Sequence, residues 1–401
     1  MSPARRTDGL DGLRALAALA VLSFHVWLYR DNRPHLLADR SALDHTLLQM
    51  NLGLICFFVL SGFLLYRAFA RAALAGGPAV DARRYALRRA ARIIPAYYVC
   101  MAGCLILFAL VGYDPITPSA GQLPIFALFA QNYSGATLMQ LNPVTWTLSV
   151  EAAFYVVLPL IGLLVLWLAR GGARAQAAVL VGFVALTVLW RALELRHGWG
   201  AIAEKTLPAY LGHFALGMLA ALWVEHRRLA ERPPLSAART ALLAGAGAVL
   251  VIALATWHET TIDLFGARDI AANLPAALGF ALIVAAVAGG AGRSVSWLSA
   301  RPLVFVGVIS YGVYLWHLPL LLVAREAGLL PHDLAPRMLT VLALALGAAW
   351  LSWVVVERPA MRWAARRPRR TARVAAAPAG LGRPERLREV GDEVAGVLDA
   401  A

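Results

Sequence analysis

Charge is scarce in this sequence. Only 15% of the 401 residues are charged, 60% are hydrophobic, and the mean hydropathy is +0.66. A soluble domain of this length needs far more polar surface, so the composition excludes an ordinary water-soluble protein and indicates that the main solvent is lipid. Lysine is nearly missing, because Lys205 is the only one and all other members of the Lys+Arg set are arginines.

Cysteine is also rare, with three in the whole chain. Cys56, Cys100 and Cys104 all fall within apolar runs. A thiol in such a run usually serves as a small buried hydrophobic group. We therefore expect neither a metal site nor a redox-active cysteine pair.

Positive charge is in excess. The formal net charge is +14, a value that in a soluble protein would suggest nucleic-acid binding. Here the arginines form short clusters between long apolar runs, which is the charge pattern that orients membrane proteins. The distribution therefore predicts membrane lipid, and no nucleic acid, as a partner.

Ten apolar runs are long enough to cross a bilayer, which takes about 20 residues. The spans are predicted at 9–30, 47–70, 94–113, 145–169, 175–196, 206–226, 238–257, 270–290, 303–325 and 336–360. Arginine clusters fall in every second connection, whereas the connection 114–144 has no Lys or Arg. The positive-inside rule then places both termini in the cytoplasm. The predicted fold class is an all-α integral membrane protein of about ten transmembrane helices.

The membrane domain is predicted to cover 1–364. The segment 365–401 is basic, then rich in Ala and Pro, then mildly acidic, which is typical of a mostly disordered cytoplasmic tail. Within the membrane domain, DARRYALRRAAR (81–92) is interpreted as an amphipathic helix at the inner surface. A short helix is predicted at 123–131 in the outer connection.

Titratable residues within the predicted spans are costly in lipid and usually mark function. Arg14 and His25 are eleven residues apart, so on a helix they lie within about 20° of one face and about 16 Å apart in height. Counting along the helices also places Glu151 and His317 about 9 Å below the outer boundary, close to the depth of His25. The alternative interpretation is a snorkelling arginine and isolated core histidines.

Arginines also gather at the predicted inner face. Arg88 and Arg92 are four residues apart and share a helix face, with Arg89 beside them. Together with Arg14 they would form a cationic rim suited to phosphates, which guanidinium groups bind through two parallel hydrogen bonds. Ordinary topological charge bias explains such arginines equally well.

Six segments resemble, in order, the family 3 membrane acyltransferases, which O-acylate glycans and natural products. They are LDGLRALAALAVLSFH (10–25), FFVLSGFLL (57–65), RRAARIIPAYY (88–98), WTLSVEAAFYVVLP (146–159), SYGVYLWHLP (310–319) and VERP (356–359). The resemblance implies that Arg14 and His25 are essential and that Arg88, Arg89 and Arg92 support donor binding. It also implies roles in substrate binding for the residues Ser61, Trp146, Ser149, Tyr155 and Tyr314.

One departure from the family pattern concerns acid–base chemistry. Where many members read SVEEQFY, this chain reads SVEAAFY, so only Glu151 supplies a carboxylate there. Some relatives also have a C-terminal SGNH-type hydrolase domain. The segment after the last span is too short for one, so we expect the membrane domain to complete the transfer or to pass the acyl group to a partner.

The expected function is transfer of an acyl group, most simply acetyl from acetyl-CoA, to a hydroxyl of a carbohydrate or glycosylated natural product. The protein is expected to be a multi-pass enzyme of the cytoplasmic membrane, with acyl-CoA as co-substrate. His25 would act as general base or as acyl-carrying nucleophile, with Glu151 orienting its imidazole and His317 as the second candidate base. The alternative from another class is a secondary transporter, although the sequence has no repeated half.

Overall fold

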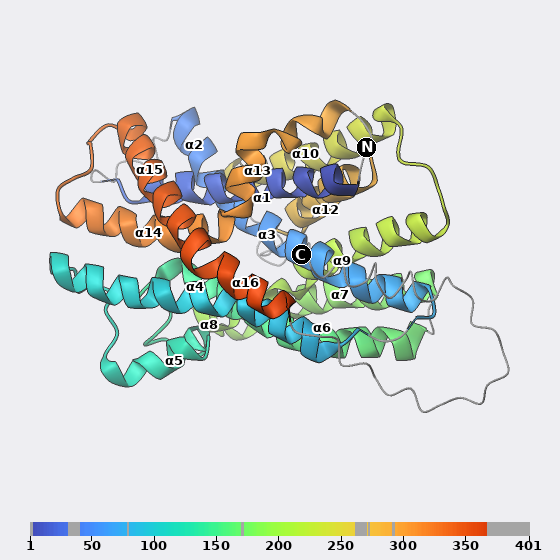
Figure 1. The fold of residues 1–401 in the computed structure, drawn as a ribbon, viewed down its shortest axis with the longest axis horizontal. Coiled ribbons are helices and arrows are strands. Elements are labelled where there is room, and N and C mark those ends of the chain that lie inside the picture. The colour runs from blue at the N-terminus through green and yellow to red at the C-terminus, as the bar shows by residue number, and fades with distance from the viewer. Residues whose placement is uncertain are drawn as a thin grey trace.

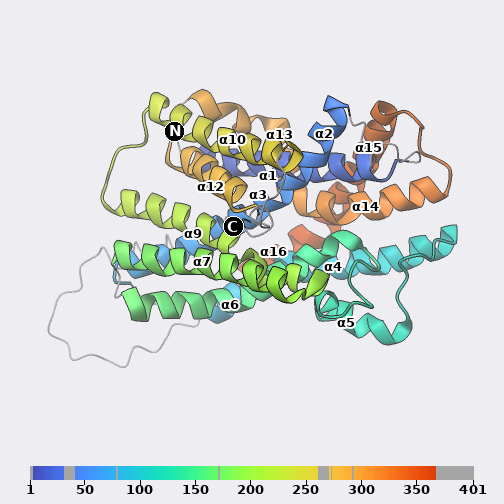
Figure 2. The same cartoon turned by 180° about the vertical axis from the view of Figure 1, so that it is seen from behind.

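The computed structural model describes residues 3–30, 41–77, 80–169, 172–260, 271, 273–290 and 293–366. This part of the chain is built of helices and contains no named strand. Most of the long helices lie along one common direction, which is horizontal in Figures 1 and 2. The tail predicted to be disordered falls on residues after 366, which are outside the described part of the chain.

Each predicted span contains a helix. They are α1 (Pro3–Leu28), α3 (Gly53–Leu74), α4 (Ala82–Val111), α6 (Trp146–Ala169), α7 (Ala173–His197), α9 (Leu207–Leu229), α10 (Ala237–Thr260), α12 (Leu274–Gly289), the pair α13 (Arg301–Val308) and α14 (Ser310–Glu326), and α15 (Leu334–Ser352) with η8 (Trp353–Glu357) and α16 (Arg358–Ala365). In the described residues, eight helices are long and apolar enough to cross a membrane, or nine if α13 and α14 form one span. The all-α membrane class is confirmed.

The predicted number of about ten spans is reached only if α12 is included. This helix has 16 residues, which is shorter than the roughly 20 that a perpendicular crossing requires. Short helices occupy the connections: α2 (Ala42–Gln49), α5 (Leu123–Ala127) and α8 (Gly200–Glu204). Helix α5 begins where the short helix 123–131 was predicted but ends at Ala127.

Helix α4 differs from the prediction. The segment 81–92 is not a separate surface helix, because α4 runs without interruption from Ala82 to Val111 and includes Pro95. A proline inside a membrane helix removes one N–H donor, and packing against neighbouring helices can compensate for that loss. Consequently Arg88 and Arg89, only 8% and 9% exposed, lie within the bundle instead of on its surface.

Two glycines allow α3 and α9 to touch backbone to backbone. A Cβ atom on Gly217 would lie 2.0 Å from the carbonyl oxygen of Val59, and one on Gly62 would lie 2.1 Å from that of Phe214. Small residues at such crossings let membrane helices approach closely, where dispersion drives their association. This crossing fixes α3, and with it Ser61, relative to the rest of the bundle.

Replacing Gly217 with alanine is expected to destabilise the protein by about 1–3 kcal/mol, because the added methyl group must push α9 away from α3. The measurement is thermal unfolding in a fixed detergent or lipid. Gly182→Ala on α7 is the matched control, since a Cβ there meets nothing within 4 Å. Equal melting temperatures for the two variants would contradict this close crossing.

Two irregularities border the interior of the bundle. Helices α13 and α14 meet at an angle of 71° around Ile309. The turn η8 is a π-helix, and it brings Glu357 to a fully buried position, where Ser352 Oγ donates to its carboxylate over 3.2 Å. Such interruptions of regular helix are frequent at functional sites. The start of α14, directly after the break, lines the charged pocket described below at Ser310 and Tyr311.

Candidate active site

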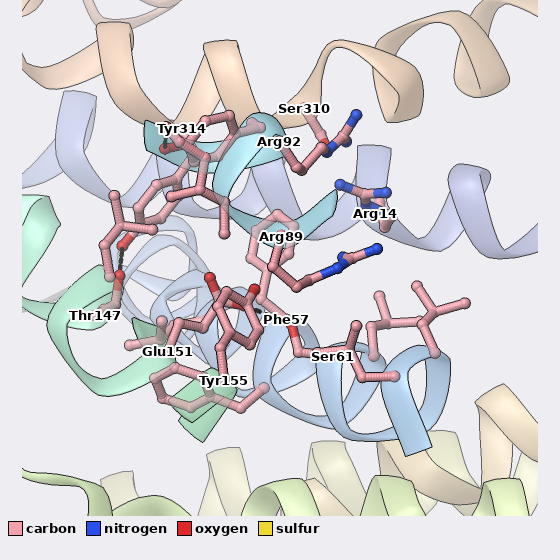
Figure 3. Close-up of a pocket in the computed structure, with 18 residues that line it drawn as sticks. Arg14, Phe57, Ser61, Arg89, Arg92, Thr147, Glu151, Tyr155, Ser310 and Tyr314 are labelled. Carbon is pink, nitrogen blue, oxygen red and sulfur yellow. Dashed lines mark hydrogen bonds between the residues drawn. The ribbon is translucent and has the colours of Figure 1, made fainter. Parts of the chain in front are cut away.

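A charged pocket of about 80 Å³ lies inside the bundle (Figure 3). Helices α1, α3, α4, α6 and α14 all contribute to its wall. Its polar and charged lining residues are Arg14, Ser61, Arg89, Arg92, Thr147, Glu151, Tyr155, Ser310, Tyr311 and Tyr314. Because charge inside a membrane domain is expensive, this pocket is the leading candidate for the functional site.

Three arginines give the pocket its positive charge. Arg14 comes from α1, while Arg89 and Arg92 are three residues apart and therefore share a face of α4. Their guanidinium groups point to the same side of the pocket in Figure 3. Arg14 has only a loose ion pair with Asp11, at 3.9 Å, and Arg92 lies against the Met361 sulfur at 3.3 Å. Grouped cations of this kind suit an anion with several oxygens, such as a phosphate.

The predicted cationic rim needs one correction. Arg88 is buried but does not line the pocket, whereas Arg89 and Arg92 do. The spacing of four residues predicted that Arg88 and Arg92 would face the same site. In the bundle, α4 is rotated so that Arg89 and Arg92, three residues apart, face the pocket. Sequence spacing allows either pairing.

Glu151 lies in the same pocket as the arginines. The Ser61 hydroxyl donates a hydrogen bond to its carboxylate, Tyr155 also interacts with it one turn further along α6, and Arg14 and Arg89 contribute favourable charge (Figure 3). Among the described residues, no imidazole bonds to Glu151. The prediction that Glu151 orients His25 is therefore wrong, because its side chain faces α3 and α4.

The structure brings the two predicted histidines together. Nε2 of His317 lies 3.2 Å from Nδ1 of His25, and the ring centroids are 5.0 Å apart. Neither histidine lines the charged pocket. Tyr314 lines the pocket and also lies beside the histidine pair: its ring is 5.9 Å from that of His317, and its hydroxyl is 2.7 Å from Thr147 Oγ1. In the described part of the chain, the pocket that contains Arg14 does not extend to His25, so the predicted single cavity joining these two residues is not observed.

The predicted substrate-binding residues separate into two groups. Ser61, Tyr155 and Tyr314 line the pocket, whereas Trp146 and Ser149 do not. The Trp146 ring instead packs 5.5 Å from that of Tyr210, and the Lys205 ammonium lies 5.6 Å from its centroid. Ser149 is buried, and its Oγ has no hydrogen-bond partner in the described part of the chain.

Three polar lining residues, Thr147, Ser310 and Tyr311, were not predicted from the sequence. Ser310 is fully buried, and within the described residues its Oγ has no hydrogen-bond partner. The Tyr311 hydroxyl donates to the Ile93 carbonyl over 3.0 Å and so ties α14 to α4. All three lie in the segments 146–159 and 310–319 that resemble the acyltransferase family. The helix break at Ile309, which the sequence did not predict, turns the start of α14 toward the pocket.

Fold and site together define a polytopic membrane protein with a cationic pocket enclosed by its helices. Residues 7–357 match the family described as Acyltransferase domain. The chain therefore belongs to this acyltransferase family, as the resemblance indicated. No solved structure matches the chain.

Curated relatives of the chain differ in length. It is 28% identical to "Acyltransferase MdmB" of Streptomyces mycarofaciens, over 90% of this chain and 93% of the relative. It is 26% identical to "Nodulation protein 10" of Rhizobium leguminosarum bv. viciae, over 88% and 93%. It is also 22% identical to "Peptidoglycan O-acetyltransferase OatA" of Listeria monocytogenes, over 87% of this chain but only 55% of the relative. The chain thus spans about half the length of that last protein.

Proposed function

We propose that this protein is a membrane-bound O-acyltransferase that moves an acyl group, most simply acetyl, from acyl-CoA to a hydroxyl of a carbohydrate or glycosylated natural product. One observation carries the proposal: three guanidinium groups gather in a pocket whose wall at Tyr314 borders the His25–His317 pair. Membership of the acyltransferase family supports the reaction type. The Listeria relative is named as a peptidoglycan O-acetyltransferase, which supports a carbohydrate acceptor.

The cationic pocket is the proposed site for the donor's phosphates. Arg14, Arg89 and Arg92 come from two helices, and phosphate oxygens can accept hydrogen bonds from guanidinium groups gathered in this way. Arg14 and His25 are separated by about 16 Å along α1, a height of the same order as an extended pantetheine arm. The thioester would reach the histidines by passing Tyr314, so this side chain would lie along the donor's path.

His25 is the proposed centre of the chemistry. As general base, it would take the proton of the acceptor hydroxyl while the hydroxyl oxygen attacks the thioester carbonyl carbon. The new C–O bond forms, the C–S bond breaks, and the departing CoA sulfur recovers the proton from the imidazolium. As nucleophile, His25 would instead receive the acyl group first and pass it to the acceptor in a second step.

Glu151 takes a different role from the one predicted. Held by Ser61 and Tyr155 beside Arg14 and Arg89, its carboxylate offsets part of the positive charge of the pocket when no donor is bound. We propose that the pocket faces the cytoplasm, that both termini lie on that side, and that the protein resides in the cytoplasmic membrane.

The decisive experiment follows labelled acetyl-CoA with the purified protein in lipid nanodiscs. Release of free CoA is expected to depend on an added acceptor, tested with glycan fragments and glycosylated small molecules, and the label should appear in the acceptor as an ester. Absence of both donor binding and acceptor-dependent CoA release would contradict the proposal. Uptake of a solute into sealed vesicles without acyl-CoA consumption would favour a transporter instead.

A further inference from the structure

The contact between His25 and His317 involves specific ring nitrogens, and these nitrogens also contact backbone carbonyls. His25 is half-buried on α1, and His317 is 1% exposed on α14. Nδ1 of each ring faces the backbone carbonyl four residues earlier: Val21 at 2.8 Å for His25, and Val313 at 3.1 Å for His317. These carbonyl contacts decide where the ring hydrogens lie.

The Val21 carbonyl selects one tautomer of His25. A carbonyl oxygen can only accept a hydrogen bond, so the nitrogen that faces the Val21 carbonyl must have the hydrogen. In a neutral imidazole the other nitrogen, Nε2, then has a free lone pair. No described residue bonds to Nε2 of His25. Within the described part of the chain, this nitrogen is therefore a base that no protein group engages.

His317 differs from His25 because both of its ring nitrogens have partners. Its hydrogen lies on Nδ1, facing the Val313 carbonyl, so the lone pair of its Nε2 is directed at Nδ1 of His25, 3.2 Å away. The Nδ1–H of His25 is then shared between the Val21 carbonyl and His317 in a three-centre hydrogen bond. Both nitrogens of His317 are engaged, and neither is available to a substrate.

We propose that His317 is a positioning residue that acts through His25. Together with the Val21 carbonyl, it accepts from Nδ1–H, which holds the ring orientation of His25 and leaves Nε2 as the reactive nitrogen. This inference rests on the proposed function, and it replaces the expectation that His317 is an alternative base. The arrangement corresponds to the third member of a catalytic triad, with a neutral imidazole in place of a carboxylate.

The proton balance follows from this assignment. When Nε2 of His25 takes the hydroxyl proton, the ring becomes an imidazolium, and its Nδ1–H becomes a stronger donor to both the Val21 carbonyl and His317. His317 stays neutral throughout. The proton leaves again from Nε2 to the CoA sulfur, so both rings return to their starting state.

Two substitutions separate positioning from packing. His317→Leu removes the acceptor, and it is expected to lower kcat by about 10²-fold while KM for acyl-CoA changes by less than about twofold. His317→Gln restores an acceptor oxygen near the place of Nε2, and it is expected to recover most of that loss. Wild-type turnover by His317→Leu would overturn the proposal, as would a folded His317→Gln variant that is no better than His317→Leu.

A second measurement needs no substrate. Nitrogen-15 NMR of the histidine-labelled protein in lipid is expected to show His25 protonated at Nδ1 in the wild type. In His317→Leu the hydrogen stays on Nδ1, facing the Val21 carbonyl, but the Nδ1 resonance is expected to shift because one of its two acceptors is lost. The His25 resonances are assigned by their loss in His25→Ala. A hydrogen on Nε2 of wild-type His25 would overturn the proposal. Absence of acyl-CoA turnover in the wild type would instead count against the proposed function, and the tautomer would still decide the role of His317.

Discussion

Replacing His25 with alanine is expected to lower acyl transfer by about 10²–10⁴-fold, the usual contribution of a positioned general base. Among the described residues, Nε2 of His25 is the one nitrogen of the histidine pair without a partner, and His317 of that pair lies beside Tyr314 of the pocket proposed for the donor. Loss of an acyl-carrying nucleophile would have at least the same effect. The measurement is acceptor-dependent CoA release by purified variants in nanodiscs, together with donor binding at equilibrium.

Donor binding distinguishes a chemical role from a structural one. His25 does not line the cationic pocket, so His25→Ala is expected to bind acyl-CoA nearly as tightly as the wild type while failing to turn it over. His226→Ala, at an exposed position near the end of α9, is the matched control and should keep full activity. If His25→Ala transferred acyl groups at nearly the wild-type rate, the mechanism proposed for His25 would be wrong.

Hydropathy predicted the helices of this fold well because long apolar runs leave a chain in lipid few alternatives to helix. It could not predict the break at Ile309, the π-helical turn Trp353–Glu357 or the short α12. Such features depend on how neighbouring helices pack. Hydropathy also did not predict the full length of α4. Its N-terminus is capped by Asp81, which accepts from the Arg84 N–H, and the helix then continues through Pro95.

The candidate site shows where counting along helices succeeds and where it fails. Residue rise places His25 and His317 at one depth, and the structure has them in contact. Glu151 was placed at a similar depth, yet it faces the arginines, because its direction depends on the rotation and tilt of α6. Depth follows from the sequence of a single helix, whereas direction requires the packing of several.

Replacing Arg89 with methionine is the second substitution with a large expected effect. Methionine keeps much of the apolar stem, so the change removes chiefly the guanidinium group from the pocket. A charge-assisted hydrogen bond to phosphate is worth about 1.5–3 kcal/mol, which corresponds to about a 10–150-fold weaker affinity for acyl-CoA. We expect kcat at saturating donor to change far less, because Arg89 does not contact the reacting atoms.

Arg88→Met is the matched control, since it removes the neighbouring guanidinium group from the same helix at nearly the same burial. Arg88 does not line the pocket, so donor affinity should fall much less than in Arg89→Met, although the family resemblance gives both arginines the same role. Binding of adenosine 3′,5′-bisphosphate, which has phosphates but no pantetheine arm, separates phosphate recognition from later steps. If Arg88→Met weakened this binding as much as Arg89→Met, the donor's phosphates would lie outside the pocket lined by Arg14, Arg89 and Arg92.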